Sequence, residues 1–81
     1  MTPIKTIVST LRSEYNLDFN KLSWHRLKDE EEEAYKNKKF SCSYRLAIAA
    51  DIKQLISDKT LHHEDRNFYI STLTEEFLKV N

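Results

Sequence analysis

The chain has 81 residues and carries 13 basic and 13 acidic side chains, so its formal net charge is zero. A chain of this length forms one domain, which we expect to span residues 1–81, and its 40% content of hydrophobic residues is too high for a disordered segment. The balanced charge argues against a general nucleic-acid-binding domain, which usually carries a basic excess. The single cysteine, Cys42, excludes an intramolecular disulfide.

The most informative feature of the composition is that the chain contains no glycine and only one proline, Pro3. Glycine is the usual residue in tight β-turns, β-bulges and phosphate-binding loops, because it adopts positive φ angles without a steric penalty. Helices, in contrast, can end at Asn, Asp, Ser or Lys. We therefore predict an all-α fold, a compact four-helix domain of short antiparallel helices.

The first helix is predicted over residues 3–15. Thr2 is a suitable N-cap, and Pro3 suits the first helical position, where its missing N–H costs nothing. Asn16 can end the helix in a left-handed conformation, and Phe19 in the following connector is expected to plug the end of the bundle. A narrow apolar stripe recurs at helical spacing: Ile4, Ile7, Val8, Leu11 and Tyr15.

The second helix is predicted to begin near Asn20 or Ser23 and to continue to about Lys38. Glu31 lies in the middle of its expected inner face, so either the helix packs loosely there and Glu31 reaches water, or Glu31 meets a cation such as Arg45 or an arginine of a partner. We favour loose packing, because burying an unpaired carboxylate is very costly. The other residues of this expected inner face are Trp24, Leu27, Ala34 and Tyr35.

The third helix is predicted to start after Phe40, with Ser41 or Ser43 as its cap, and to end at about Asp58. It is apolar over more than half of its circumference, which is typical of a central helix with neighbours on several sides. Phe40, like Phe19, is expected to plug an end of the bundle.

The fourth helix is predicted to begin near residues 61–65, where an apolar residue precedes the cap and acidic residues occupy the first turn. At about 100° per residue, Phe68 points nearly opposite the inner stripe of this helix, so we expect it to be exposed and to contact another chain. The inner stripe consists of Ile70, Leu73, Phe77 and Val80.

Metal-binding and catalytic sites are not indicated by the sequence. Residues 62–65 read His-His-Glu-Asp, but adjacent residues of a helix point in different directions and cannot all face one ion. Cys42 lies between two serines at a helix start, where a thiolate is stabilised, yet a lone cysteine in a small helical domain usually serves only as a packed residue. We therefore predict no metal, no cofactor and no enzymatic activity.

Part of the second helix resembles a fragment of the HMG box, a family of domains that bend DNA in the minor groove. The resemblance covers only residues 24–38, and the rest of the chain departs from the family, because its charge is neutral and two apolar helices follow. We therefore assign no functional residue from it. The positions with similar spacing are Trp24, Leu27, the pair Glu30 and Glu31, Tyr35 and Lys38.

A small helical DNA-binding transcriptional regulator is the alternative function. The third and fourth helices could form a helix-turn-helix around residues 58–62, but the turn lacks the usual glycine and the acids that follow it would repel phosphate. Nucleic acid is therefore the less favoured partner. The basic residues available to this alternative are Arg26, Lys28, Lys36, Lys38 and Lys39.

Protein binding is the favoured function, because small helical domains without a catalytic motif typically act by docking, and aromatic residues dominate the energetics of interfaces. We predict a non-enzymatic interaction module, a regulator, inhibitor or immunity-type protein of bacterial or phage type, that binds another protein or forms a homodimer. No segment reads as a membrane span or a signal peptide, so a cytoplasmic location is expected. The predicted interaction residues are Phe68, Trp24, Glu31 and Tyr35.

Overall fold

The computed structural model describes residues 4–80, and these residues form four α-helices and no strand. The helices are α1 (Ile4–Tyr15), α2 (Trp24–Lys36), α3 (Phe40–Ser57) and α4 (His63–Lys79). The predicted all-α fold, a compact domain of four short helices, is confirmed.

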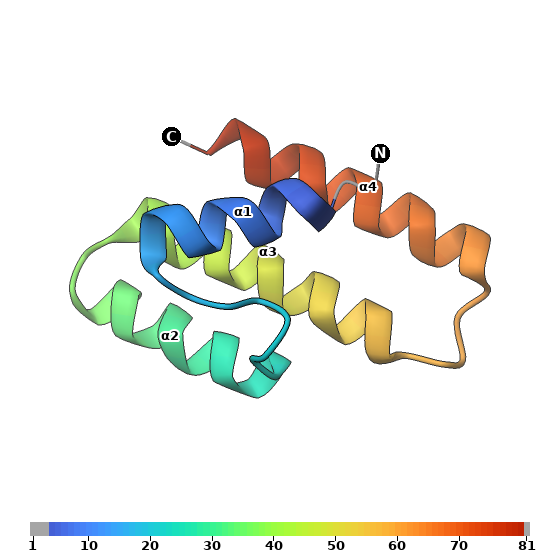
Figure 1. Ribbon diagram of the computed structural model, residues 1–81, viewed down its shortest axis with the longest axis horizontal. Helices are drawn as coiled ribbons and strands as arrows, with labels where there is room; N and C mark the ends of the chain where they lie inside the picture. The colour runs from blue at the N-terminus through green and yellow to red at the C-terminus, as the bar shows by residue number, and fades with distance from the viewer. Residues whose placement is uncertain (1–3, 81) are drawn as a thin grey trace.

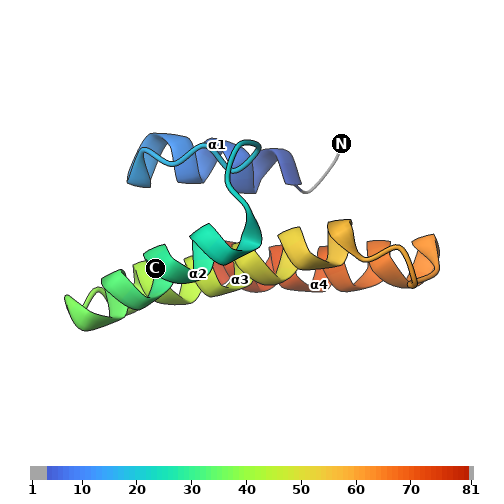
Figure 2. The ribbon, with the colours of Figure 1, turned by 90° about the horizontal axis from the view of Figure 1, so that it is seen from below.

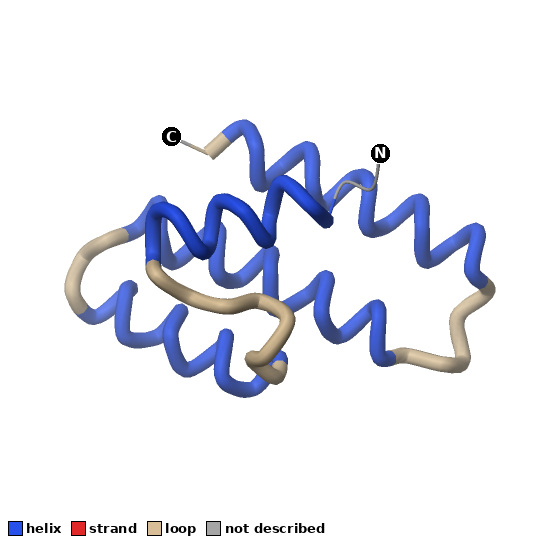
Figure 3. The backbone as a smooth tube through the Cα atoms, viewed as in Figure 1, coloured by secondary structure: helices blue, strands red, loops and turns tan. Residues whose placement is uncertain are grey.

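Three of the helices form a layer, and the fourth lies on one face of it. α2, α3 and α4 run side by side and antiparallel, with α3 in the middle (Figure 1). α1 and the connector of residues 16–23 lie across one face of this layer, whereas no helix of residues 4–80 covers the opposite face (Figure 2). The connector carries the chain back from the end of α1 to the start of α2 (Figure 3).

The core lies between α1 and the layer. Phe19 of the connector is only 2% exposed, which confirms that it plugs the bundle. Lys53 of α3 holds it there, because Lys53 Nζ donates a hydrogen bond to the Phe19 carbonyl oxygen and lies 4.4 Å from the centre of the Phe19 ring. The largest fully buried side chains come from every helix and the connector: Phe19, Phe77, Ile7, Leu11, Leu27, Leu46 and Ile52.

The ends of α1 and α2 follow the local sequence. Asn16 adopts a φ of 56° after α1, as predicted, and the Leu17 N–H donates to the Leu11 carbonyl at 3.0 Å, which is typical of a left-handed C-terminal cap. The predicted roles of Thr2 and Pro3 fall outside the described residues. Ser23 caps α2, because its hydroxyl accepts from the Arg26 N–H at 3.2 Å.

The turn between α2 and α3 corrects two predicted boundaries. α2 ends at Lys36 instead of Lys38, because Lys38 adopts a φ of 62° and reverses the chain. α3 then begins at Phe40 itself, with Lys39 as an N-cap that makes no side-chain hydrogen bond, so neither predicted serine is the cap. The turn is closed by the backbone, since the Lys39 N–H donates to the Ala34 carbonyl at 2.9 Å.

The start of α4 is the predicted one. His62 is the N-cap, and its Nδ1 accepts from the Glu64 N–H at 3.3 Å. Arg66 ties this start to the end of α3, because it donates to the Asp58 carbonyl at 3.0 Å and to the Leu61 carbonyl. None of the helices in the described part of the chain is long and apolar enough to cross a membrane.

Candidate functional site

α1 and the connector cover one side of α3, and the contacts on that side show which residues of α3 lie on the opposite, uncovered side. Cys42 and Leu46 line a groove beside Tyr15 of α1, and Lys53 bonds to Phe19 of the connector. At about 100° per residue, five positions of α3 lie roughly opposite these three. They are Phe40, Tyr44, Ala47, Asp51 and Leu55.

α2 contributes a second stripe to the same side. Its residues Glu30, Ala34 and Asn37 line the groove under α1, so positions about 90° or more around the helix from them face away from the groove. Of these positions, Trp24, Lys28, Glu31 and Tyr35 lie on the side next to α3, and the exposed Glu32 lies farther from α3. Lys28 Nζ lies 3.9 Å from Asp51 Oδ1, which joins the two stripes into one surface. We call this surface the outer face; it consists of Trp24, Lys28, Glu31 and Tyr35 from α2 and of Phe40, Tyr44, Ala47, Asp51 and Leu55 from α3.

Aromatic side chains gather where the outer face meets the α2–α3 turn. Tyr35 and Phe40 pack edge to face, with ring centres 5.4 Å apart, and are 64% and 57% exposed. Tyr44, one turn further along α3, is 50% exposed. The prediction that Phe40 plugs the bundle is therefore wrong, because the first position of α3 faces away from α1. Tyr35 also does not lie on the inner face, since Leu27 and Ala34 fill the buried positions of α2.

Glu31 lies between Lys28 and Tyr35 on the outer face, and its cation is Lys28 of its own helix. Lys28 Nζ is 3.5 Å from Glu31 Oε1, which is enclosed and accepts no hydrogen bond, while the side chain as a whole is 26% exposed. The exposure of 26% agrees with the favoured interpretation that Glu31 reaches water. Arg45, the example of a cation in the alternative interpretation, instead contacts Glu14, Tyr15 and Val80. The carboxylate is therefore partly desolvated but still open to the surface. A further cation would stabilise this carboxylate more than it would stabilise a fully hydrated one, because the lower local dielectric strengthens the attraction.

Arg45 instead joins α3 to the end of α1 and to the end of α4. Its Nη1 donates to the Tyr15 hydroxyl at 3.1 Å and to Glu14 Oε1 at 3.2 Å, and its Nη2 donates to the Val80 carbonyl oxygen. The guanidinium also lies over the Phe77 ring, 5.6 Å from its centre. The hydrogen bond with Tyr15 raises the pKa of Arg45, although burial opposes this shift.

A second exposed surface lies on the side of α4 that faces away from α3. Phe68 is 67% exposed, as predicted, and packs edge to face against Tyr69 at 5.8 Å between ring centres. Phe68 is nine positions before the buried Phe77, which places it on the opposite side of the helix. The charged residues within about two turns of it on this side are acidic, the hydroxyl residues Ser71 and Thr72 lie one turn along, and Lys79 lies about three turns along. We call this surface the α4 edge; it consists of Glu64, Asp65, Phe68, Tyr69 and Glu75.

The four predicted interaction residues thus fall on two surfaces. Trp24, Glu31 and Tyr35 share the outer face, where Trp24 is half-buried and stacks on His25 with ring centres 3.7 Å apart. Phe68 belongs to the α4 edge. The sequence reasoning did not place Phe40 and Tyr44 on a common surface, although their spacing of four positions on one helix was a visible signal.

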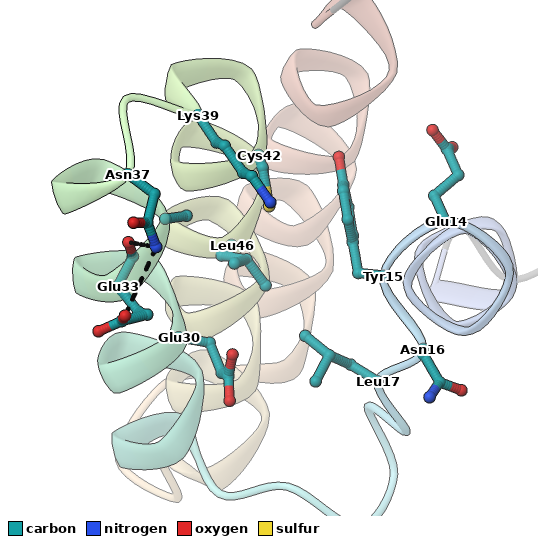
Figure 4. A pocket seen from close by; sticks show the side chains of 11 residues that line it. Glu14, Tyr15, Asn16, Leu17, Glu30, Glu33, Asn37, Lys39, Cys42 and Leu46 are labelled. Atoms are coloured by element: carbon teal, nitrogen blue, oxygen red, sulfur yellow. Dashed lines mark hydrogen bonds between the residues drawn. The ribbon is translucent and has the colours of Figure 1, made fainter.

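The covered side of the layer contains a groove of about 510 Å³ near the end of α1 (Figure 4). Cys42 and Leu46 lie on its floor, Tyr15 and Leu17 form one wall, and Glu30 points in from α2. Burial raises the pKa of the Cys42 thiol, and the nearby lysine and arginine only partly oppose this shift. Because the thiolate is the reactive form, this environment does not favour a nucleophilic cysteine.

Histidine and acidic residues do not gather into a metal site in the structure. Among residues 4–80, no group of three or more His, Cys, Asp or Glu side chains is arranged to hold an ion. The rings of His62 and His63 stack with their centres 4.7 Å apart, and His62 is engaged as a helix cap.

Of the five basic residues of the DNA-binding alternative, two pair with acidic residues and three gather at the α2–α3 turn. Arg26 lies 3.7 Å from Glu30, and Lys28 is shared between Glu31 and Asp51. The remaining three basic residues lie at the exposed α2–α3 turn or next to it: Lys36, Lys38 and Lys39.

Comparison with known proteins assigns no family to this chain. No family model matches it, and no curated protein and no solved structure matches it either. A function is therefore inferred from the two exposed surfaces, the outer face and the α4 edge.

Proposed function

We propose that the chain is a non-enzymatic interaction module that binds a basic surface of another protein through the α4 edge. The observation that carries this proposal is Phe68, which is 67% exposed on the side of α4 opposite the core. Covering it removes on the order of 100 Å² of apolar surface from water, which is worth about 2–3 kcal/mol. Tyr69 already contacts the ring and limits its motion, so part of the cost of ordering an interface residue is met in the free protein.

The charges around Phe68 indicate the chemistry of the partner. Glu64, Asp65 and Glu75 are all exposed and lie within about one turn or two of Phe68 on the same side of α4. An aromatic residue surrounded by carboxylates complements an apolar pocket bordered by Lys or Arg. A small regulator, inhibitor or immunity-type protein that blocks a basic surface would act in this way, at an intracellular site.

The test compares two exposed hydrophobic residues of the same helix. The tagged protein is used to purify partners from its own cells, in the wild-type form and as Phe68→Ala, Glu75→Lys and Leu78→Ala. Leu78 is 55% exposed and lies outside the α4 edge. We expect a partner that the wild type and Leu78→Ala retain and that Phe68→Ala and Glu75→Lys lose. Retention of every partner by Phe68→Ala, with unchanged helicity, would contradict the proposal.

The DNA-binding alternative is separated from this proposal by salt. A module that used Lys36, Lys38 and Lys39 would bind random duplex DNA at low salt, with an affinity that falls steeply as salt is added. We expect no such binding, because the net charge of zero gives no overall attraction to the phosphate backbone. Salt-dependent binding to duplex DNA would favour the alternative.

A further inference from the structure

The outer face differs from the α4 edge in that its side chains are complementary to themselves. On α2 the stripe reads Trp24, Lys28, Glu31, Tyr35, that is, aromatic, cation, anion, aromatic. If a second stripe of the same sequence is laid against it in the opposite direction, each aromatic residue meets an aromatic residue and each charge meets the opposite charge. A two-fold axis perpendicular to the helices produces this arrangement, because it makes equivalent helices antiparallel.

We infer that the outer face is the interface of a symmetric homodimer, in which α2 and α3 of one protomer lie antiparallel to α2 and α3 of its partner. Trp24 then packs against the partner subunit's Tyr35, and Lys28 pairs with the partner subunit's Glu31. Among residues 4–80, the partly desolvated carboxylate of Glu31 forms an ion pair with Lys28 of its own helix alone, and it gains a second cation in this arrangement. This interface is independent of the α4 edge and of the function proposed for it.

α3 supplies a contact of complementary shape, in which Leu55 is the apolar residue of the hollow. Asp51, Gln54, Leu55 and Asp58 line a shallow hollow of about 330 Å³ at one end of its outer side. The exposed Phe40 and Tyr44 project at the other end. With α3 antiparallel to its symmetry mate, the aromatic end of each protomer lies over the hollow of the other. Ala47, near the middle of the helix, is small enough for the two helices to approach closely.

The outer face lies on one broad side of the molecule. The molecule measures 37 × 22 × 18 Å, and α1 is stacked on the layer along the shortest dimension (Figure 2). α2 and α3 share this broad side with α4 (Figure 1), so the outer face is smaller than the roughly 800 Å² that each partner of a standard-size interface buries, and it fits the low end of interface sizes. The net charge of zero adds no overall repulsion between copies.

The α4 edge cannot serve as the self-association surface in the same way. A two-fold axis there would bring the acidic residues of both copies, Glu64, Asp65 and Glu75, into one interface, and none of the residues that define the edge is basic and able to pair with them. Like charges placed opposite one another across an interface cost several kcal/mol. The two surfaces are therefore assigned to different occupants, a second copy on the outer face and a basic partner on the α4 edge.

Two charge reversals test the arrangement. Sedimentation equilibrium of the wild type is expected to give twice the monomer mass of 9.7 kDa. Lys28→Glu puts two acids opposite two acids in each dimer, and Glu31→Lys puts two lysines opposite two lysines. Each variant alone is therefore expected to dimerise at least about tenfold more weakly.

Mixing the two variants is the decisive measurement. In an antiparallel pair, the two acids that Lys28→Glu presents on α2 face the two lysines that Glu31→Lys presents, so an equimolar mixture is expected to form a heterodimer. An effect confined to the α2 helix of a single protomer cannot produce this rescue. Circular dichroism on each variant verifies that it remains helical.

Two further variants provide the controls. Glu75→Lys reverses a charge on the α4 edge and is expected to leave the dimer unchanged, whereas Tyr35→Ala is expected to weaken it. A wild-type protein that remains monomeric at submillimolar concentration would overturn the inference. Two helical variants that remain monomeric when mixed would also overturn it. A dimer that survives Phe68→Ala while the partner is lost would show that the two surfaces act separately.

Discussion

The outer face and the α4 edge both expose aromatic pairs packed edge to face, yet they differ in the charges that surround them. On α2, Lys28 and Glu31 alternate in sign between two aromatic residues, so the surface can complement a copy of itself. On α4, the charged residues within about two turns of Phe68 on its side of the helix are acidic, so the surface favours a partner of opposite charge. Exposed aromatic area thus provides binding energy on both surfaces, and the charge pattern selects the occupant.

The largest effect on stability is expected from a change in the core of α3, because this helix positions both surfaces. Ile52 is fully buried in the middle of α3. We expect Ile52→Ala to lower the free energy of unfolding by about 2–4 kcal/mol, because the cavity would not be refilled in so thin a core. Urea denaturation measures this change. A variant as stable as the wild type would show that α3 is not the central helix, and the layer that defines both surfaces would then be in doubt.

A smaller effect is expected from the residue that holds α1 and the end of α4 against α3. Arg45→Ala removes hydrogen bonds to Tyr15, Glu14 and the Val80 carbonyl, so we expect a loss of about 1–3 kcal/mol in thermal or urea unfolding. These contacts lie away from both exposed surfaces, so binding by the folded fraction should be unchanged. Arg45→Lys provides the control, since one ammonium cannot reproduce all three contacts, and full recovery by lysine would contradict this account.

A still smaller effect on stability is expected from the exposed aromatic residues themselves. Phe68→Ala and Tyr35→Ala should each change the free energy of unfolding of the monomer by within about 0.5 kcal/mol, because both side chains are largely in water already. Their effects on association should differ, since Phe68 acts on the α4 edge and Tyr35 on the outer face. A large loss of monomer stability for either variant would place that residue in the core.

The smallest effect is expected from Asp58, at the end of the outer face, and it depends on pH. Hydrogen bonds from the Thr60 hydroxyl at 2.6 Å and from the Thr60 N–H at 2.8 Å lower the pKa of Asp58 below its ordinary value of 3.8. A carboxyl group with a lowered folded-state pKa stabilises the fold above its unfolded-state pKa, and this contribution is lost as the pH falls through the folded value.

The difference in unfolding free energy between the wild type and Asp58→Asn, followed from about pH 6 to pH 2, measures this contribution. The wild type should be the more stable of the two at the upper end, and the difference should close as the carboxyl group is protonated. A difference that does not change with pH would mean that the turn at residues 58–60 is not held by the ionised carboxylate.

Local sequence alone determined the all-α architecture and most helix ends. Three local features predict these elements: the absence of glycine, the N-cap Ser23 and the left-handed Asn16. Each acts on the backbone conformation of neighbouring residues, so a short segment of sequence is enough to predict the helix or its end. The exposure of Phe68 was predictable for the same reason, since its position opposite Phe77 depends only on helical spacing.

Tertiary structure decided which faces of the central helices remain open. α3 is apolar around much of its circumference, so its sequence does not reveal which side α1 covers, and Phe40 and Tyr44 could equally have been buried. Only the packing of α1 on one face of the layer places them at the surface beside Tyr35 and Glu31 (Figure 2). Helical spacing determines which residues share one side of a helix. Which other helix packs against that side depends on contacts between segments far apart in the chain.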